Sequence, residues 1–298
     1  MDEHKVTLAI FSGVPDPVWT VHSGHESFNK FKEHLQNART TQKTYRHEHM
    51  SPILGYKGFL VHPPEAEEGE LVVGHETKAL QKLLLETMPE GLMPTTLCQK
   101  ISHAIEEGSV SHQTQMASRQ DVLQDSSKGT KDETEILRYA PKLNLARWNS
   151  QSLVRSSNNC YNYANNHITN SFAQPGYVSG HRITSVTPQG VLQAAESDGL
   201  VKMDVAQSDP CPPAPKQPNC LVALVVAEGE DFHWYRLDDN GRWSHKPGKS
   251  SATIYDGANN LIDDPRNAAN SPHGPDYKFV SFMKIFTNII DGPVGPHA

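Results

Sequence analysis

The pattern of apolar and polar positions predicts alternating strands and helices over the first third of the chain. Residues 5–11 alternate as a strand does, and residues 53–64 form a second apolar run that ends at two prolines. Residues 26–38 carry three apolar side chains at helical spacing: Phe28, Phe31 and Leu35. Residues 71–88 begin as a short strand and continue as a helix. This β-α-β-α order predicts a small α+β domain over residues 1–105.

A polar stretch follows, over residues 106–135. It holds few large apolar residues and many Ser, Gln, Lys and Asp, a composition that cannot bury enough surface to fold by itself. We therefore expect a flexible, protease-sensitive linker. A further hypothesis is that cleavage there separates the two domains or activates the protein.

Residues 136–298 predict a second domain, with helices first and strands after them. One helix starts near Cys160, and residues 187–200 predict another, capped by Thr187. A buried strand, a hairpin that turns at Asp239-Asn240-Gly241, and a last strand at 276–286 follow. The predicted fold class is α+β: a small N-terminal α+β domain, then a helix carrying a cysteine and an antiparallel sheet.

Charge and hydropathy indicate which partners the protein would bind and where in the cell it would lie. The net charge of −7 gives no global basic surface for a phosphate backbone, so we expect no nucleic acid partner. The longest apolar run, Leu221–Ala227, is far shorter than the roughly 20 residues that span a bilayer. The acidic N-terminus does not resemble a usual signal peptide. The default expectation is a cytoplasmic protein, and secretion by a non-standard route stays open.

The four cysteines are too few for a disulfide scaffold: Cys98, Cys160, Cys211 and Cys220. No pair has the spacing of a zinc-binding CxxC motif. Cys211 and Cys220 flank a proline-rich loop that a bridge would close in an oxidising compartment. Two free thiols are the alternative there.

Cys160, His233 and His245 form the strongest chemical pattern in the sequence. A helix N-terminus and a nearby imidazole both favour a thiolate, and Cys160 follows Asn158-Asn159 where a helix should begin. His233 lies at the start of a hairpin strand, and His245 follows twelve residues later, across the turn. With the turn centred near Asn240, and residue 239 midway between the two histidines, these should lie nearly opposite one another. His245 would then orient the ring of His233 as the third member of a triad.

This order of residues resembles the papain-like cysteine peptidase superfamily. The second histidine makes it similar to the NlpC-type peptidases, whose triad is often Cys-His-His, over about residues 150–290. The resemblance implies a cysteine hydrolase, a peptidase or amidase, with Cys160 as nucleophile, His233 as base and His245 as the orienting residue. An acyl-enzyme would form on Cys160 and be resolved by water.

Residues beside the triad are candidates for oxyanion and substrate binding. The backbone N–H of Cys160 would be one oxyanion donor, and the side-chain amide of Asn158 or Asn159 a second. Either asparagine could instead act only as a helix cap. Three aromatic residues would line the cleft or simply pack in the core: Tyr161, Trp234 and Trp243.

Several alternatives stay open at this point. Asp256 or Asn259 could replace His245 as the third member of the triad. Zinc held by Cys160, His233 and His245 is the rival chemistry, although we expect no metal or cofactor.

The substrate would be a peptide, an isopeptide or a cell-wall peptide, and the protein could act as a toxin or defence effector. An inactive binding protein of the same fold and a thiol acyltransferase are the alternative functions, and the N-terminal domain would bind or target.

Overall fold

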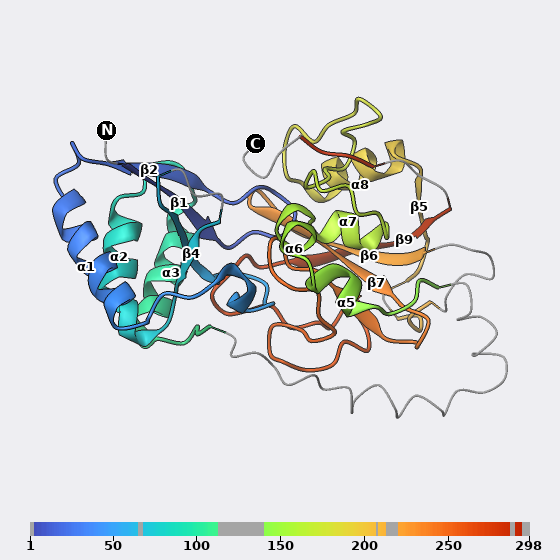
Figure 1. Cartoon of the computed structure of the whole chain (residues 1–298). Helices are drawn as coiled ribbons and strands as arrows, with labels where there is room; N and C mark the ends of the chain where they lie inside the picture. The colour runs from blue at the N-terminus through green and yellow to red at the C-terminus, as the bar shows by residue number, and fades with distance from the viewer. Residues whose placement is uncertain are drawn as a thin grey trace. The chain divides into compact units, whose positions relative to one another are not determined.

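The computed structural model confirms the α+β class, with helices and two antiparallel sheets (Figure 1). It describes residues 3–64, 68–112, 140–206, 208–212, 220–286 and 290–293. Most of the predicted linker, from residue 113 to 135, lies outside these described residues. Among the described residues, no helix is both long enough and apolar enough to cross a membrane.

Internal contacts divide the chain into two compact units. Unit 1 comprises Met1–Phe11, Asp16–Gln115 and Ser271–Gly274. Unit 2 comprises Ser12–Pro15, Met116–Asn270 and Pro275–Ala298. The short segment Ser12–Pro15 therefore belongs with the C-terminal unit although it lies near the N-terminus. The boundaries predicted from the sequence, at 105 and 136, stay predictions.

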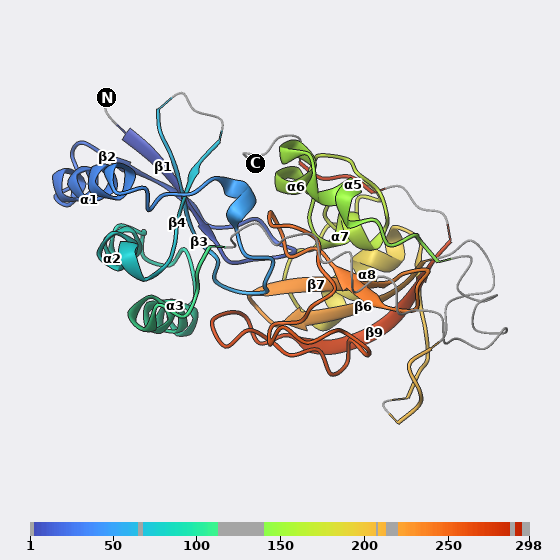
Figure 2. The same ribbon diagram turned by 60° about the horizontal axis from the view of Figure 1, so that its bottom comes forward.

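Unit 1 is one antiparallel sheet with a layer of helices beside it. Its strands run in the order β2-β1-β3-β4: β1 Glu3–Ala9, β2 Val18–His22, β3 Gly58–His62 and β4 Glu70–Val72. Its helices are α1 Phe28–Thr40, α2 Lys78–Glu86 and α3 Thr95–Glu107, with single 3-10 turns at His47–His49 and His75–Thr77. Helix α2 lies between α1 and α3 (Figure 2). Since α3 ends at Glu107, the first two residues of the predicted linker are helical.

Unit 2 places its helices before its strands, as predicted. Its helices are α5 Leu145–Asn149, α6 Ser152–Ser157, α7 Cys160–Ala164 and α8 Pro188–Ser197. The sheet has the order β5-β9-β6-β7-β8 and is antiparallel throughout. Its strands are β5 Leu200–Lys202, β6 Cys220–Ala227, β7 Asp231–Leu237, β8 Trp243–His245 and β9 Lys278–Ile285.

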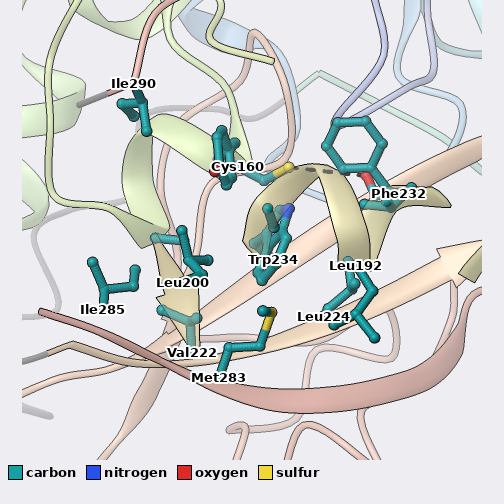
Figure 3. Close-up of a cluster of buried hydrophobic side chains, with 14 of the residues drawn as sticks. Cys160, Leu192, Leu200, Val222, Leu224, Phe232, Trp234, Met283, Ile285 and Ile290 are labelled. Carbon is teal, nitrogen blue, oxygen red and sulfur yellow. Dashed lines mark hydrogen bonds between the residues drawn. The ribbon is translucent and has the colours of Figure 1, made fainter. Parts of the chain in front are cut away.

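The core of unit 2 joins α7 and α8 to one face of this sheet (Figure 3). Alternate residues of β6 and β7 point into it, because successive side chains of a strand face opposite sides. The buried members from these four elements include Cys160, Tyr161, Val191, Leu192, Ala195, Val222, Leu224, Val226, Phe232 and Trp234. The intervening residue His233 therefore projects to the other side of β7. This alternation places the His233 ring away from the Phe232 and Trp234 side chains, which pack in the same cluster as Cys160.

Candidate functional site

Cys160 is the first residue of α7, where a capping box fixes the start of the helix. The Asn159 side chain accepts hydrogen bonds from the backbone N–H groups of Tyr161 and Asn162, and Asn162 returns a bond to the Asn159 N–H. The thiol is free and fully buried, with its sulfur 3.9 Å from the Phe232 carbonyl oxygen. The helix start predicted for the nucleophile is therefore present.

The sulfur of Cys160 lies beside a stretch of β7 that β8 does not cover. Strand β8 pairs only with residues Tyr235–Leu237, so it ends before the start of β7. The backbone of Trp234 at this edge hydrogen-bonds to the thiol. The short length of β8 thus leaves the Trp234 backbone open to the cysteine of α7.

The environment of Cys160 favours the neutral thiol. Burial, with Asp231 as a second cause, raises the pKa of Cys160 to about 12. The hydrogen bonds that Cys160 shares with the Ser12 side chain and the Trp234 backbone lower the pKa, but by less than burial raises it. In this structure the cysteine is therefore in a resting state rather than an activated thiolate.

Two histidines form a hydrogen-bonded relay behind the thiol. His233 Nε2 lies 2.8 Å from His245 Nδ1, and His245 Nε2 lies 2.8 Å from the carbonyl oxygen of Tyr255. His233 Nδ1 lies 2.6 Å from the hydroxyl oxygen of Ser12, which also bonds to the Cys160 side chain. The residues predicted as base and orienting residue are therefore in contact, and a serine that the sequence analysis did not include joins them to the cysteine.

The direction of these hydrogen bonds follows from the carbonyl at the end of the relay. Tyr255 O can only accept, so His245 Nε2 carries a proton and, for a neutral ring, Nδ1 accepts. His233 must then donate from Nε2, which leaves an unprotonated Nδ1 that accepts from the Ser12 hydroxyl. The lone pair of His233 Nδ1 thus faces Ser12, whose hydroxyl also bonds to Cys160, and this is the side that a general base requires.

The hairpin brings the two histidines close together without placing them directly opposite one another. His245 pairs with Tyr235, because the turn is centred on residue 240 and the midpoint of the two histidines is residue 239. His233 and His245 are therefore diagonal neighbours on one face of the hairpin, a separation that two imidazole rings can bridge. Asp256, the alternative third member, uses its carboxylate to accept from the backbone N–H groups of three residues of its own loop: Ala258, Asn260 and Ala269.

Asp231 holds the Ser12 segment against this site. Its carboxylate accepts from the backbone N–H groups of Ser12, Gly13 and Val14 at 2.6 to 3.0 Å and from the Tyr277 hydroxyl at 2.6 Å. Burial raises the pKa of Asp231 to about 6, against these hydrogen bonds, which lower it. Sequence reasoning missed both Asp231 and Ser12, since 219 positions separate them and neither belongs to a local motif.

The two asparagines proposed as oxyanion donors are engaged in this structure. Asn158 bonds to the Val154 carbonyl and to Asn170 and accepts from two backbone N–H groups, so it fixes the loop at 169–170. Asn159 caps α7 and donates its side-chain N–H groups to the carbonyls of Gly13 and Ala173. The capping alternative is therefore present for Asn159, and its oxyanion role stays a prediction.

The three aromatic candidates are buried in the core rather than placed along an open cleft. Tyr161 donates its hydroxyl proton to Asp198 and packs beside Trp234, with ring centroids 5.5 Å apart. Trp243 packs against Phe282. Each of the three is at most 1% exposed. In this state their role is packing, the other alternative that the sequence left open.

The sequence also left open a disulfide between Cys211 and Cys220 and a bound metal ion. The thiols of Cys211 and Cys220 are both free. In the part of the chain that the structure describes, no group of three or more His, Cys, Asp or Glu side chains is arranged to hold a metal ion.

Replacing Asn159 by alanine is expected to destabilise the fold by about 2–4 kcal/mol, since it removes a helix cap and leaves two carbonyls short of a donor. The matched control is Asn144→Ala, which removes the exposed cap of α5 and should cost about 1 kcal/mol or less. Urea unfolding of both variants measures the difference. Equal losses would contradict the role given to the buried asparagine.

The Cys160 thiol is expected to react very slowly with iodoacetamide. With a pKa of about 12, only ~10⁻⁴ of the thiol is ionised at pH 8, against roughly a quarter of a thiol with an ordinary pKa. The rate should therefore rise about tenfold per pH unit between pH 8 and 10 while the fold persists. Peptide mass spectrometry of Cys160, with Cys98 as an internal reference, measures both rates. A Cys160 that reacts faster than Cys98 at pH 8 would contradict the resting state.

Comparison with known proteins gives one relationship to report. No protein-family model matches the chain. No solved structure matches it either. It is 45% identical over 138 residues to the insoluble matrix shell protein 1 of Ruditapes philippinarum, a match that covers 46% of this chain and 85% of that protein. At this identity and coverage, the chain belongs to the family of the insoluble matrix shell protein 1.

Proposed function

We propose that the protein is a cysteine hydrolase, a peptidase or amidase, with Cys160 as nucleophile, His233 as base and His245 as the orienting residue. The observation that carries this proposal is the directed relay from Tyr255 O through both imidazoles, which leaves the His233 Nδ1 lone pair on the side of the thiol. A buried histidine pair with only a packing role would have no need of this polarity. The similarity to papain-like peptidases supports the same assignment.

The proposed reaction has two steps. His233 Nδ1 takes the proton of the Cys160 thiol, and the thiolate adds to the carbonyl carbon of an amide. The new C–S bond forms, the C–N bond breaks, and His233 gives its proton to the leaving amine. Water then adds to the thioester and passes a proton to His233, the C–S bond breaks to release the carboxylic acid, and Cys160 regains its proton from His233. His245 keeps the His233 ring in the tautomer that this sequence needs.

A test of this function compares hydrolysis by the wild-type chain with hydrolysis by Cys160→Ala. A panel of peptides, isopeptides, cell-wall peptides and lipid esters is incubated with each, and products are identified by mass spectrometry. Release of an amine that depends on Cys160 supports a peptidase or amidase, whereas transfer of an acyl group to a second acceptor favours an acyltransferase. Matched inertness of the two chains at every substrate, also when both carry Gly13→Ala to displace the Ser12 segment from the thiol, would overturn the proposal.

A non-catalytic component of an extracellular matrix is the second candidate. The 45% identity to a shell matrix protein favours it, and so does the complete burial of Cys160. It would also imply that the chain is exported. If this candidate holds, Cys160→Ala should leave the assembly of the chain into sedimentable material unchanged, and no amide substrate should turn over.

A further inference from the structure

We propose that the segment Ser12–Val14 occupies the substrate site of unit 2, and that the groups which hold it form a binding site for a glycine-containing peptide. The inference rests on the proposed function, because it names the substrate class and the resting state of the same site. Four side chains of unit 2, two of them from β7, converge on the segment: Asn159, Gln174, Asp231 and Phe232.

The carbonyl group of Gly13 is held by two side-chain amides. Gln174 Nε2 donates to its oxygen at 2.8 Å and Asn159 Nδ2 at 3.1 Å. Asn159 directly precedes Cys160, so this pair of donors lies next to the residue that bears the thiol. Two amide donors on one carbonyl oxygen are what an acyl-transfer site needs to bind and polarise its substrate.

The backbone N–H groups of the segment are held by a single carboxylate. Asp231 accepts from three successive residues, Ser12, Gly13 and Val14, and the side chain of Val14 packs against the core cluster around Cys160. A carboxylate that binds three N–H groups recognises a peptide backbone without regard to its charged side chains. It also excludes a proline or N-methylated residue at these positions, because neither carries the proton.

Phe232 restricts the central position of the segment to glycine. A Cβ atom built on Gly13 would lie 2.4 Å from the Phe232 ring and 2.5 Å from the Phe232 carbonyl oxygen. Neither contact is tolerated, and the backbone oxygen cannot turn away as a side chain can. The site therefore selects a residue without a side chain at the carbonyl held by Asn159 and Gln174.

The seated segment also keeps the reactive groups inactive. Ser12 places its hydroxyl against both His233 Nδ1 and Cys160, so it fills the position that a substrate would need. All three of these residues are fully buried. Withdrawal of the segment would expose the thiol and the imidazole together, and a glycine peptide would then take its place on the same donors.

The test uses the full-length chain and the rate at which iodoacetamide modifies Cys160 at pH 8. Gly13→Ala should displace the segment and raise this rate by roughly three orders of magnitude or more, because the thiol regains solvent and the ionised fraction at pH 8 rises from ~10⁻⁴ to about a quarter or above. Gly24→Ala, at an exposed glycine with only the His22 ring nearby, is the matched control and should leave the rate unchanged. Cys98 reports in each chain whether the fold as a whole has opened.

Refilling of the site by a peptide completes the test. The acetylated amide of Phe-Ser-Gly-Val-Pro, the sequence of residues 11–15, should protect Cys160 in Gly13→Ala, and the same peptide with alanine for glycine should not. An unchanged Cys160 rate, or protection without preference for glycine, overturns the inference. Gln174→Leu, which removes one donor to the Gly13 carbonyl, gives a second route to a faster rate if Gly13→Ala does not fold.

These results separate the inference from the proposed function, since alkylation and protection need no turnover. Glycine-selective protection without hydrolysis of any amide would support the binding site and overturn the hydrolase. Hydrolysis of an amide by Gly13→Ala, without protection of Cys160 by the peptide, would support the hydrolase and overturn the binding site.

Discussion

In the Gly13→Ala chain, replacing His233 by glutamine is expected to lower the rate of Cys160 alkylation at pH 6 by about two orders of magnitude. A thiol paired with histidine in a papain-like site has a pKa of about 3–4, whereas an isolated thiol has one of about 8.5. At pH 6 the first is almost fully ionised, and the second is ionised to well under 1%. Glutamine keeps a hydrogen-bonding side chain of similar reach at 233 but cannot accept the proton, so the thiolate is lost.

His103→Gln is the matched control for this experiment, because His103 is an exposed residue of α3, in unit 1, with its Nε2 3.1 Å from the Glu107 carboxylate. Its Cys160 rate should equal that of the parent chain. The alkylation rate of Cys160 in His245→Gln should lie between the rates in the parent chain and in His233→Gln. This substitution weakens the orientation of His233 but leaves the base in place. A His233→Gln chain that reacts as fast as its parent would mean that the imidazole does not activate the thiol.

Replacing Arg236 by alanine is expected to destabilise the fold by about 3–5 kcal/mol, the largest loss that we expect from a single substitution. Arg236 is fully buried, forms an ion pair with Asp238 at 2.7 Å and donates to the Tyr163 carbonyl at 2.9 Å. Its guanidinium also lies 4.0 Å from the centre of the Tyr163 ring. Without it, the Asp238 carboxylate stays buried with no positive partner, and α7 loses its tie to β7.

Arg242→Ala is the comparison for this buried pair. Arg242 lies in the same hairpin and pairs with the largely exposed Asp263 at 3.5 Å. A pair so open to solvent contributes only ~0.5 kcal/mol or less. Thermal unfolding of both variants measures the contrast, and a similar shift in the two midpoints would show that the buried network does not hold the hairpin to α7.

Much of the fold followed from local patterns in the sequence. Thr187 caps α8 with Pro188 in its first turn, as predicted, because a cap and its helix lie within a few residues. The strand β2 was missed, since its five residues follow two prolines and resemble a turn. Helix α3 carries Leu97, Ile101 and Ile105 at helical spacing, so the signal was present but was not used.

The candidate site was predictable only where its residues share a local element. Cys160 and its Asn159 cap are adjacent, and His233 and His245 share one hairpin. The local pattern of residues therefore indicated all four as candidates. The turn is centred on residue 240, so the two histidines are diagonal rather than directly opposite neighbours. Their rings still meet, since an offset of two residues keeps both side chains on the same face.

The groups around the triad could not be predicted, because they come together only in the folded chain. Ser12 reaches His233 across 221 positions, and Gln174 reaches Gly13 across 161. Nothing in the local sequence around Ser12 indicates more than a turn. These long-range contacts also decide the state of the enzyme proposed here, since they seat Ser12–Val14 where a substrate would bind.

The most direct test of the proposed function is the reaction of the Gly13→Ala chain with p-nitrophenyl acetate, an activated acyl donor. We expect an initial burst close to one equivalent of nitrophenolate per chain, an acetyl group located on Cys160 by peptide mass spectrometry, and continued turnover as water resolves the thioester. Both the burst and the turnover should disappear in Cys160→Ala and fall strongly in His233→Gln. Acetylation that bypasses Cys160, or that proceeds equally without His233, would contradict a cysteine hydrolase.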